Sequence, residues 1–179
     1  MIIKDLSIPG IKIIKNKSFK DKRGWFSEVY TKNAYEKILK LKNIVQENTS
    51  FSKKGVIRGL HFQEYPFRQG KLIKVINGAI FDVAVDIRKG SNTFGKYVSY
   101  YLDSYSNEQI WIPDGFAHGF CSIEEDTLVS YKVTKYYNPD SERTILWNDK
   151  DINIKWPISN PILSQKDKKG IMLHKLISK

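Results

Sequence analysis

Short runs of apolar and β-branched residues recur along most of the chain, and within each run apolar and polar positions tend to alternate. Alternation at a period of two is typical of a half-buried β-strand, and strands that recur at this spacing are typical of a sandwich or barrel. The predicted strands cover residues 11–14, 26–30, 45–51, 56–63, 71–76, 79–88, 97–102, 109–112, 116–123 and 127–137. The pattern therefore predicts an all-β protein, a mainly antiparallel jelly roll or β-barrel with a few short helices.

One segment, residues 33–42, has the periodicity of a helix, and Thr31 or Asn33 is placed to cap its start. The dipeptide Asn77-Gly78 stands between two predicted strands and is typical of a two-residue type I′ turn, so the sequence predicts a hairpin there. Long helices do not alternate with the strands, which disfavours a Rossmann fold. Because no linker or internal repeat interrupts the pattern, we expect a single domain over residues 1–179.

The composition is that of a folded globular protein. Apolar residues make up 41% of the 179 residues and charged residues 27%, which excludes a disordered or fibrous chain. No apolar run reaches the roughly 18 residues that a membrane span needs, and residues 1–5 lack the basic-then-apolar order of a secretory signal, so we expect a cytoplasmic protein. Cys121 is the only cysteine, which excludes an intrachain disulfide and a thiolate metal cluster.

The chain is basic, with 30 Lys and Arg against 19 Asp and Glu and a formal net charge of +11. Such an excess suits a nucleic acid, an anionic membrane surface or a small anionic substrate such as a nucleotide diphosphate. The lysines are scattered rather than gathered in one block, so a solvated lysine-rich surface is the simplest interpretation. Charge alone does not choose among these partners.

Ionisable residues on otherwise apolar strands are the first candidates for chemistry. In the run 71–76 both faces of the predicted strand are apolar apart from Lys71 and Lys74, so at least one of these lysines is expected to point into an enclosed cavity. Asp82 lies between apolar neighbours in the same way, and His61 is one of only three histidines. A β-barrel lumen that holds a histidine, a lysine and an aspartate is suited to acid–base chemistry.

Two segments have the spacing of metal-binding cupin motifs. Residues 55–61 match the start of the first motif, and residues 113–118 match the second. However, Gln63 replaces the second histidine of the first motif, and no glutamate follows at the usual spacing. His61 and His118 alone make a poor site for iron, manganese or zinc, so we expect neither a catalytic metal nor another cofactor.

Further motifs follow one another from residue 21 to residue 167. They lie at residues 21–28, 46–52, 55–63, 70–72, 82–88, 112–120, 147–149 and 163–167. In this order they resemble the dTDP-4-dehydrorhamnose 3,5-epimerase family, metal-free cupin-type enzymes of nucleotide-sugar metabolism. The resemblance implies an enzyme that inverts C3 and C5 of a dTDP-4-keto-6-deoxy sugar, and a homodimer that exchanges strands at the N-terminus. It favours a nucleotide-sugar substrate over a nucleic acid or a membrane.

The resemblance also implies a role for individual residues. His61 matches the general base, and Asp167 matches the carboxylate that orients it. Lys71 matches the cation beside the C4 keto oxygen. Tyr131, which the strand pattern alone does not distinguish from a core tyrosine, matches the acid on the opposite face of the sugar. Tyr136 matches an aromatic residue that flanks the nucleotide base. The other matched substrate contacts are Arg23, Glu28, Gln46, Asn48, Arg58, His118, Glu142 and Lys166.

Some questions stay open at this level. Simple alternation puts Arg58 and His61 on opposite faces of a strand, so Gly59 must mark a bend if both reach the substrate. The same residues would serve an epimerase that inverts only C3. A metal-dependent cupin oxygenase or isomerase is disfavoured by the missing ligands. A non-catalytic sugar-binding module would not need a base and an acid together.

Overall fold

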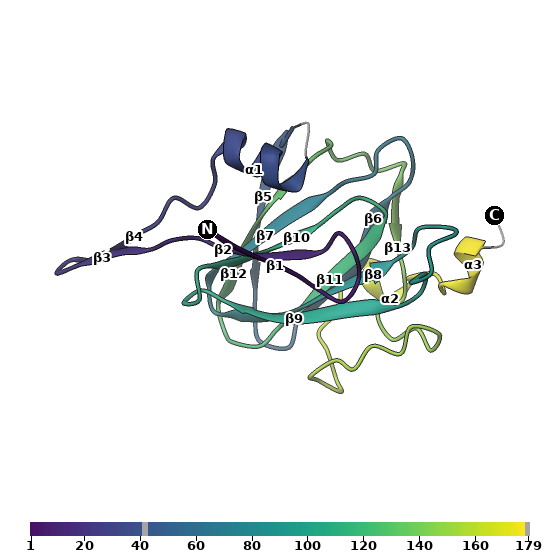
Figure 1. Cartoon of the computed structure of the whole chain (residues 1–179). Coiled ribbons are helices and arrows are strands. Elements are labelled where there is room, and N and C mark those ends of the chain that lie inside the picture. Colours follow the sequence, from purple (N-terminus) through teal and green to yellow (C-terminus); the bar gives the residue numbers. More distant parts are fainter. Residues whose placement is uncertain (41–42, 178–179) are drawn as a thin grey trace.

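The computed structural model describes residues 1–40 and 43–177 and consists mainly of two antiparallel β-sheets packed face to face (Figure 1). The first sheet has the strand order β1 (Ile2–Asp5), β2 (Lys12–Lys15), β10 (Glu108–Ile112), β7 (Lys71–Asn77), β12 (Thr127–Val133) and β5 (Gln46–Ser52). The second has the order β13 (Glu142–Thr144), β6 (Ile57–Gln63), β11 (Phe116–Ser122), β8 (Ala79–Asp86) and β9 (Tyr97–Asp103). This arrangement confirms the predicted all-β, cupin-type jelly roll.

A separate hairpin of β3 (Phe19–Asp21) and β4 (Gly24–Phe26) projects from the body of the molecule (Figure 1). Three helices complete the described chain: α1 (Lys32–Leu39), α2 (Gln165–Lys168) and α3 (His174–Ile177). None of the helices in residues 1–40 and 43–177 is long and apolar enough to cross a membrane.

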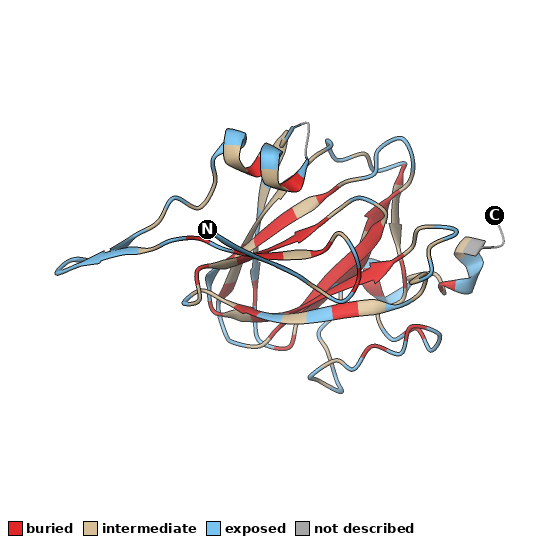
Figure 2. Ribbon diagram, viewed as in Figure 1, coloured by how far each residue is buried: buried red, intermediate tan, exposed pale blue. Residues whose placement is uncertain are grey.

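Three apolar clusters hold these layers together, and Figure 2 shows that buried residues lie mainly along the central strands. The first fills the space between the two sheets. The second lies behind the five-stranded sheet, which the C-terminal segment covers, so that all seven residues of β11 are buried. The third lies on the outer face of the six-stranded sheet, where Tyr35 of α1 packs near Trp111. The space between the sheets is therefore a closed core except where polar side chains enter it.

The predicted hairpin at Asn77-Gly78 is wrong. β7 pairs with β10 and β12, whereas β8 pairs with β9 and β11, so the chain crosses from one sheet to the other at this dipeptide. Gly78 does have the left-handed backbone that the dipeptide favours, with φ +79°. The same local preference suits any sharp turn, and it does not specify which strands will pair.

The predicted strand at residues 26–30 is also wrong, because β4 ends at Phe26. In residues 27–30, which follow β4, hydrogen bonds from side chains take the place of the backbone bonds to a neighbouring strand. The carbonyl of Val29 accepts hydrogen bonds from Asn16, Tyr35 and Gln109 at 3.2, 2.7 and 2.8 Å. The segment is therefore anchored by side chains of other elements rather than by a sheet.

The other predicted strands agree with the structure to within two residues at each end, with one exception. The strand predicted over residues 127–137 ends at Val133, and the strands at residues 2–5, 19–21 and 142–144 were not predicted. The helix predicted over residues 33–42 begins at Lys32 and ends at Leu39, while residues 41–42 lie outside the described chain. Thr31 occupies the N-cap position without capping, since its hydroxyl bonds to Glu28 Oε1 at 2.8 Å.

Candidate active site

A cavity of about 370 Å³ lies between the two sheets, and it gathers most of the predicted site residues. The six-stranded sheet contributes side chains from β5, β7 and β12, and the five-stranded sheet contributes side chains from β6, β11 and β13. Residues 164–167 close one side. The lining residues are Ser50, Arg58, His61, Lys71, Ile73, His118, Phe120, Val129, Tyr131, Glu142, Ser164, Lys166 and Asp167.

His61 and Asp167 form a close pair, with His61 Nε2 and Asp167 Oδ1 2.5 Å apart. Asp167 is buried in the short helix α2, and its backbone N–H donates to Ser164 Oγ at 3.0 Å. Burial lowers the pKa of His61, while the bond to Asp167 opposes that change. Burial would raise the pKa of Asp167, but the hydrogen bond with His61, the charges of His61 and Lys166 and the hydrogen bond with Ser164 together lower it. The pair therefore presents a neutral imidazole that can accept a proton at neutral pH.

A bulge brings Arg58 and His61 to the same cavity. In the β6–β11 ladder His61 lies opposite His118 and Arg58 lies opposite Phe120, so three steps along β6 match two along β11. The backbones approach closely here, since a Cβ on Gly59 would lie 2.4 Å from Gly119 Cα. The bend that the sequence required at Gly59 is thus present, and it turns Arg58 inward.

Gly119→Ala should damage this bulge. Its Cβ would lie 2.8 Å from the carbonyl oxygen of Arg58 and 3.0 Å from Gly59 Cα, and backbone atoms cannot swing aside. We expect the free energy of unfolding in urea to fall by about 1–3 kcal/mol. Gly90→Ala is the control: nothing lies within 4 Å of its Cβ, and only its φ of +84° is strained. A free energy of unfolding that is unchanged in Gly119→Ala would contradict a close approach of β6 and β11.

Lys71 is the lysine that enters the cavity. Its side chain points between the sheets, and its Nζ donates to the carbonyl of His61 at 3.2 Å. Burial lowers the pKa of Lys71 to about 8, although the negative charges of Asp82 and Glu142 act to raise it. Lys74 lies on the other face of β7 and donates to Asn107 Oδ1 at 3.1 Å. The expectation that at least one of the two lysines points into a cavity is confirmed.

Tyr131 faces the cavity from β12, in the sheet opposite to the one that carries His61. It is half-buried between its cross-strand neighbours Ile73 and Asn48. Its hydroxyl makes no hydrogen bond to another described residue, and burial raises its pKa. Tyr131 is therefore a neutral phenol whose proton is available to a ligand in the cavity.

A second histidine–carboxylate pair lies deeper in the lumen. His118 Nε2 and Asp82 Oδ2 are 2.8 Å apart, and both side chains are buried. The other oxygen of Asp82 has no partner within the described chain. Strand alternation placed Asp82 in the lumen correctly, but it gave no sign that His118 would be its partner.

The remaining polar contacts gather near the edge of the cavity. Lys166 Nζ lies 2.6 Å from Glu142 Oε1, and the hydroxyl of Tyr137 donates to Glu142 Oε2 at 3.0 Å. Gln46 donates to Asn48 Oδ1 at 2.8 Å and accepts from the backbone N–H of Tyr137 at 3.1 Å. Sequence reasoning missed Tyr137 and Ser164, and only their proximity to matched residues could have suggested them.

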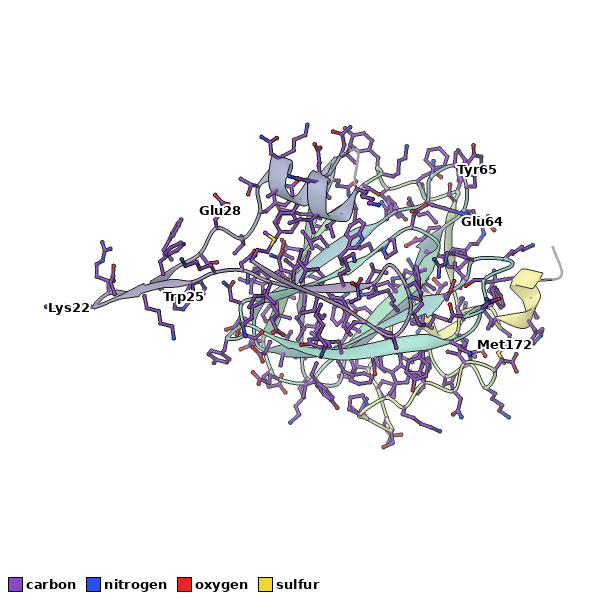
Figure 3. The ribbon with its side chains drawn as sticks, viewed as in Figure 1. Lys22, Trp25, Glu28, Glu64, Tyr65 and Met172 are labelled. Carbon is purple, nitrogen blue, oxygen red and sulfur yellow. The ribbon has the colours of Figure 1, made fainter. Side chains whose placement is uncertain are left out.

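Five predicted substrate contacts do not line this cavity: Gln46 and Asn48, whose contacts are described above, and Tyr136, Arg23 and Glu28. Tyr136 is 68% exposed and lines a neighbouring depression. Arg23 lies at the tip of the projecting hairpin, paired with Asp21 at 2.6 Å. Glu28 follows that hairpin, and Figure 3 shows it, together with Trp25, toward the end of the molecule opposite to Tyr65. Within one chain, Arg23 and Glu28 are therefore separate from the site.

The residues nearest to the missing metal ligands are engaged elsewhere. Gln63 is bonded to backbone groups, and Glu64 pairs with Arg143 at 2.7 Å. Among the residues that the structure describes, no group of three or more His, Cys, Asp or Glu side chains is placed to hold a metal ion. The donor set present, two histidines that each contact a carboxylate, is arranged for proton transfer rather than for a common metal.

A jelly roll of two antiparallel sheets with a site between them is typical of the cupin class of proteins, and comparison with known proteins identifies the family within this class. The sequence profile of dTDP-4-dehydrorhamnose 3,5-epimerase matches residues 5–175. The dTDP-4-dehydrorhamnose 3,5-epimerase of Shigella flexneri is 49% identical over 164 residues, which cover 91% of either chain. The chain belongs to the dTDP-4-dehydrorhamnose 3,5-epimerase family.

Solved structures agree with this assignment. The dTDP-6-deoxy-D-glucose-3,5-epimerase of Legionella pneumophila, in complex with dTDP-4-keto-L-rhamnose, has a TM-score of 0.93 and 43% identity, covering 97% of this chain and 93% of its own. A 3'-monoepimerase of Streptomyces bikiniensis, in complex with dTDP-quinovose, has a TM-score of 0.91 and 29% identity, covering 97% of this chain and 88% of its own. The fold is thus shared by enzymes that differ in how many centres they invert.

Proposed function

We propose that this protein is an isomerase that inverts C3 and C5 of dTDP-4-dehydro-6-deoxy-D-glucose and so forms dTDP-4-dehydro-L-rhamnose. The observation that carries the proposal is that His61 and Tyr131 face one cavity from opposite sheets. Lys71 faces the same cavity from the six-stranded sheet, which also carries Tyr131. An inversion needs a base on one side of the sugar ring and an acid on the other. The names of the relatives, at 42–49% identity for several of them, support the same reaction.

The reaction follows from the acidity of a C–H bond beside a ketone. His61, oriented by Asp167, removes the proton and leaves an enolate whose charge rests on the C4 oxygen. Lys71 is the cation that stabilises this oxygen. Tyr131 then delivers a proton to the other face of the ring, which inverts the centre. The C4 ketone activates C3 and C5 alike, so the same three groups serve both centres, and the reaction requires no redox cofactor.

The substrate contacts divide by chemistry. Arg58, Lys166 and His118 line the cavity and are suited to the diphosphate and the sugar oxygens, because guanidinium and ammonium groups match phosphate. Gln46, Asn48 and Glu142 lie toward the nucleoside. Tyr136 lies beside this cluster and flanks the base, as the family resemblance implies.

We place Arg23 and Glu28 in the site of a second subunit. Arg23 lies on the projecting hairpin and Glu28 just follows it, and this hairpin exposes large apolar side chains: Phe19, Trp25 and Phe26 are 53%, 55% and 68% exposed. An exposed apolar surface of this kind is typical of an interaction site. A homodimer that exchanges these hairpins would complete both cavities. A cytoplasmic location stays a prediction.

The test is incubation with dTDP-4-keto-6-deoxyglucose in D2O, followed by proton NMR. Deuterium at both C3 and C5, with inverted product, is the expected result. Deuterium at C3 alone would identify the second candidate, a C3 epimerase, which the likeness to the Streptomyces bikiniensis 3'-monoepimerase favours. Deuterium at neither centre would contradict both enzymes and leave a sugar-binding module.

Lys71→Met should lower kcat by about 10²–10³ while changing KM far less, because an oxyanion partner acts mainly where charge develops. Wild-type kcat/KM should fall above a pH near 8, where free Lys71 loses its proton, and this limb should be absent from the residual activity of the variant. The control is Lys74→Met, on the same strand but the opposite face, which should turn over at nearly the wild-type rate. An effect confined to KM would instead assign Lys71 to diphosphate binding.

A further inference from the structure

Gln63 is a buried polar side chain for which the proposed chemistry has no use. It is the last residue of β6 and is 5% exposed. Its carboxamide makes three hydrogen bonds, all to backbone groups. Nε2 donates to the carbonyls of Phe67 and Tyr136 at 2.6 and 3.2 Å, and Oε1 accepts from the N–H of Asn138 at 2.7 Å.

This pattern requires a carboxamide. Two carbonyl partners need two N–H donors, and the backbone N–H needs an acceptor on the same planar group. A neutral histidine supplies one donor and one acceptor, and a carboxylate supplies no donor. Gln63 occupies the position of the second histidine of the first cupin motif, so at this position a metal ligand has been replaced by a clamp on the backbone.

The clamp holds a segment that has no strand of its own. β12 ends at Val133 and β13 begins at Glu142, and residues 134–141 between them are irregular. Gln63 fixes this segment on both sides of Tyr137, at the carbonyl of Tyr136 and at the N–H of Asn138. Beyond it, the N–H of Glu64 donates to the carbonyl of Ser141 at 2.9 Å.

The clamped segment carries Tyr136, which the proposed function places against the nucleotide base, and Tyr137 beside it. Tyr136 and Tyr137 are 68% and 54% exposed, so packing in a core does little to hold them. The backbone N–H of Tyr137 donates to Gln46 Oε1 at 3.1 Å, and its hydroxyl donates to Glu142 Oε2 at 3.0 Å. A displacement of this segment would therefore move Tyr136 and Tyr137 and break the bonds of Tyr137 to Gln46 and Glu142, and it would leave His61 bonded to Asp167.

We infer that Gln63 is a positioning residue that sets the affinity of the site for the nucleoside part of the substrate, by holding residues 136–138 through two backbone groups. The inference rests on the proposed function, in which Tyr136 flanks the nucleotide base. It separates the two ends of the site: Gln63 governs binding of dTDP, while His61, Lys71 and Tyr131 govern the chemistry.

The test is Gln63→Leu, which keeps the size of the side chain and removes all three hydrogen bonds. Loss of buried bonds should weaken dTDP binding, measured by calorimetry, by about tenfold or more. KM for the dTDP-4-keto sugar should rise in parallel, with kcat and deuterium exchange at saturating substrate within about threefold of wild type, since a residue that acts only on binding spares the turnover step.

Gln69→Leu is the matched control. Its amide donates to the carbonyl of Lys135 at 2.7 Å, one residue from Tyr136, but the bond is exposed to solvent. We expect dTDP affinity within about twofold of wild type, because water replaces such a bond readily. If Gln63→Leu does not fold, Gln63→Glu keeps the shape and the acceptor, lacks both donors, and should weaken dTDP binding in the same direction.

The outcomes are distinguishable. Unchanged dTDP affinity in folded Gln63→Leu or Gln63→Glu would overturn the inference, as would a fall in kcat at constant KM, which would place Gln63 behind His61 instead. Wild-type protein that binds dTDP but does not turn over the keto sugar would contradict the proposed function alone, because the dTDP measurement still tests Gln63.

Discussion

His61→Ala should abolish epimerisation at C3 and C5 while the protein stays folded and still binds dTDP. A positioned general base contributes about 10²–10⁴ to the rate, and His61 serves both centres, so product should fall to the limit of detection. Deuterium exchange should disappear with it, because no proton leaves the sugar. The fold should survive, since His61 lies at a cavity wall and is not part of the apolar clusters. Proton NMR in D2O measures both quantities in one sample.

The chain offers a control within its three histidines. His174→Ala, on the exposed helix α3 where the ring lies 3.3 Å from Asp151, should leave turnover unchanged. The turnover of Asp167→Asn should lie between that of His61→Ala and that of His174→Ala. An amide at this position still bonds to the imidazole of His61 but no longer stabilises its charged form. Activity of more than a few per cent in His61→Ala would show that another group removes the proton.

Strand alternation predicted the faces of the sheet well, because a period of two is fixed by the backbone itself. It placed Asp82 in the lumen and required one lysine of β7 to enter it, and both expectations hold. Alternation fails where the backbone departs from regularity. The bulge that turns Arg58 inward depends on how closely β6 and β11 approach, which the local sequence shows only as an isolated glycine in a strand.

Strand alternation does not predict which side chains from distant parts of the chain contact each other. Asp167 is 106 residues from His61, and Asp82 is 36 residues from His118. No local pattern connects such residues, so Asp167 was identified only through the family resemblance. The same limit explains the error at Asn77-Gly78, where the turn was foreseen but the change of sheet was not. The sequence shows only that Gln63 is not a metal ligand, whereas its three bonds to backbone groups depend on the folded chain.

The two-sided arrangement leads to a second large effect. Tyr131→Phe removes only the phenolic hydroxyl, which bonds to no other described residue, so packing between Ile73 and Asn48 should be preserved. His61, which lies in the opposite sheet, should still remove the proton from the sugar. No proton should be delivered to the other face of the sugar ring. The enolate would then regain its proton on the side from which it left. We expect the variant to incorporate deuterium from D2O while inverted product falls by about 10²-fold or more, the usual contribution of a positioned acid.

Tyr100→Phe is the control for loss of a hydroxyl. Tyr100 is half-buried against the same core but bonds to Glu108 at 2.8 Å and does not line the cavity, so both exchange and inversion should match wild type. Wild-type inversion in Tyr131→Phe would assign the acid to another group in the cavity, with Lys71 the next candidate. If exchange and inversion fall together, the hydroxyl also holds the enolate, because a pure acid that acts after the enolate has formed cannot slow its formation.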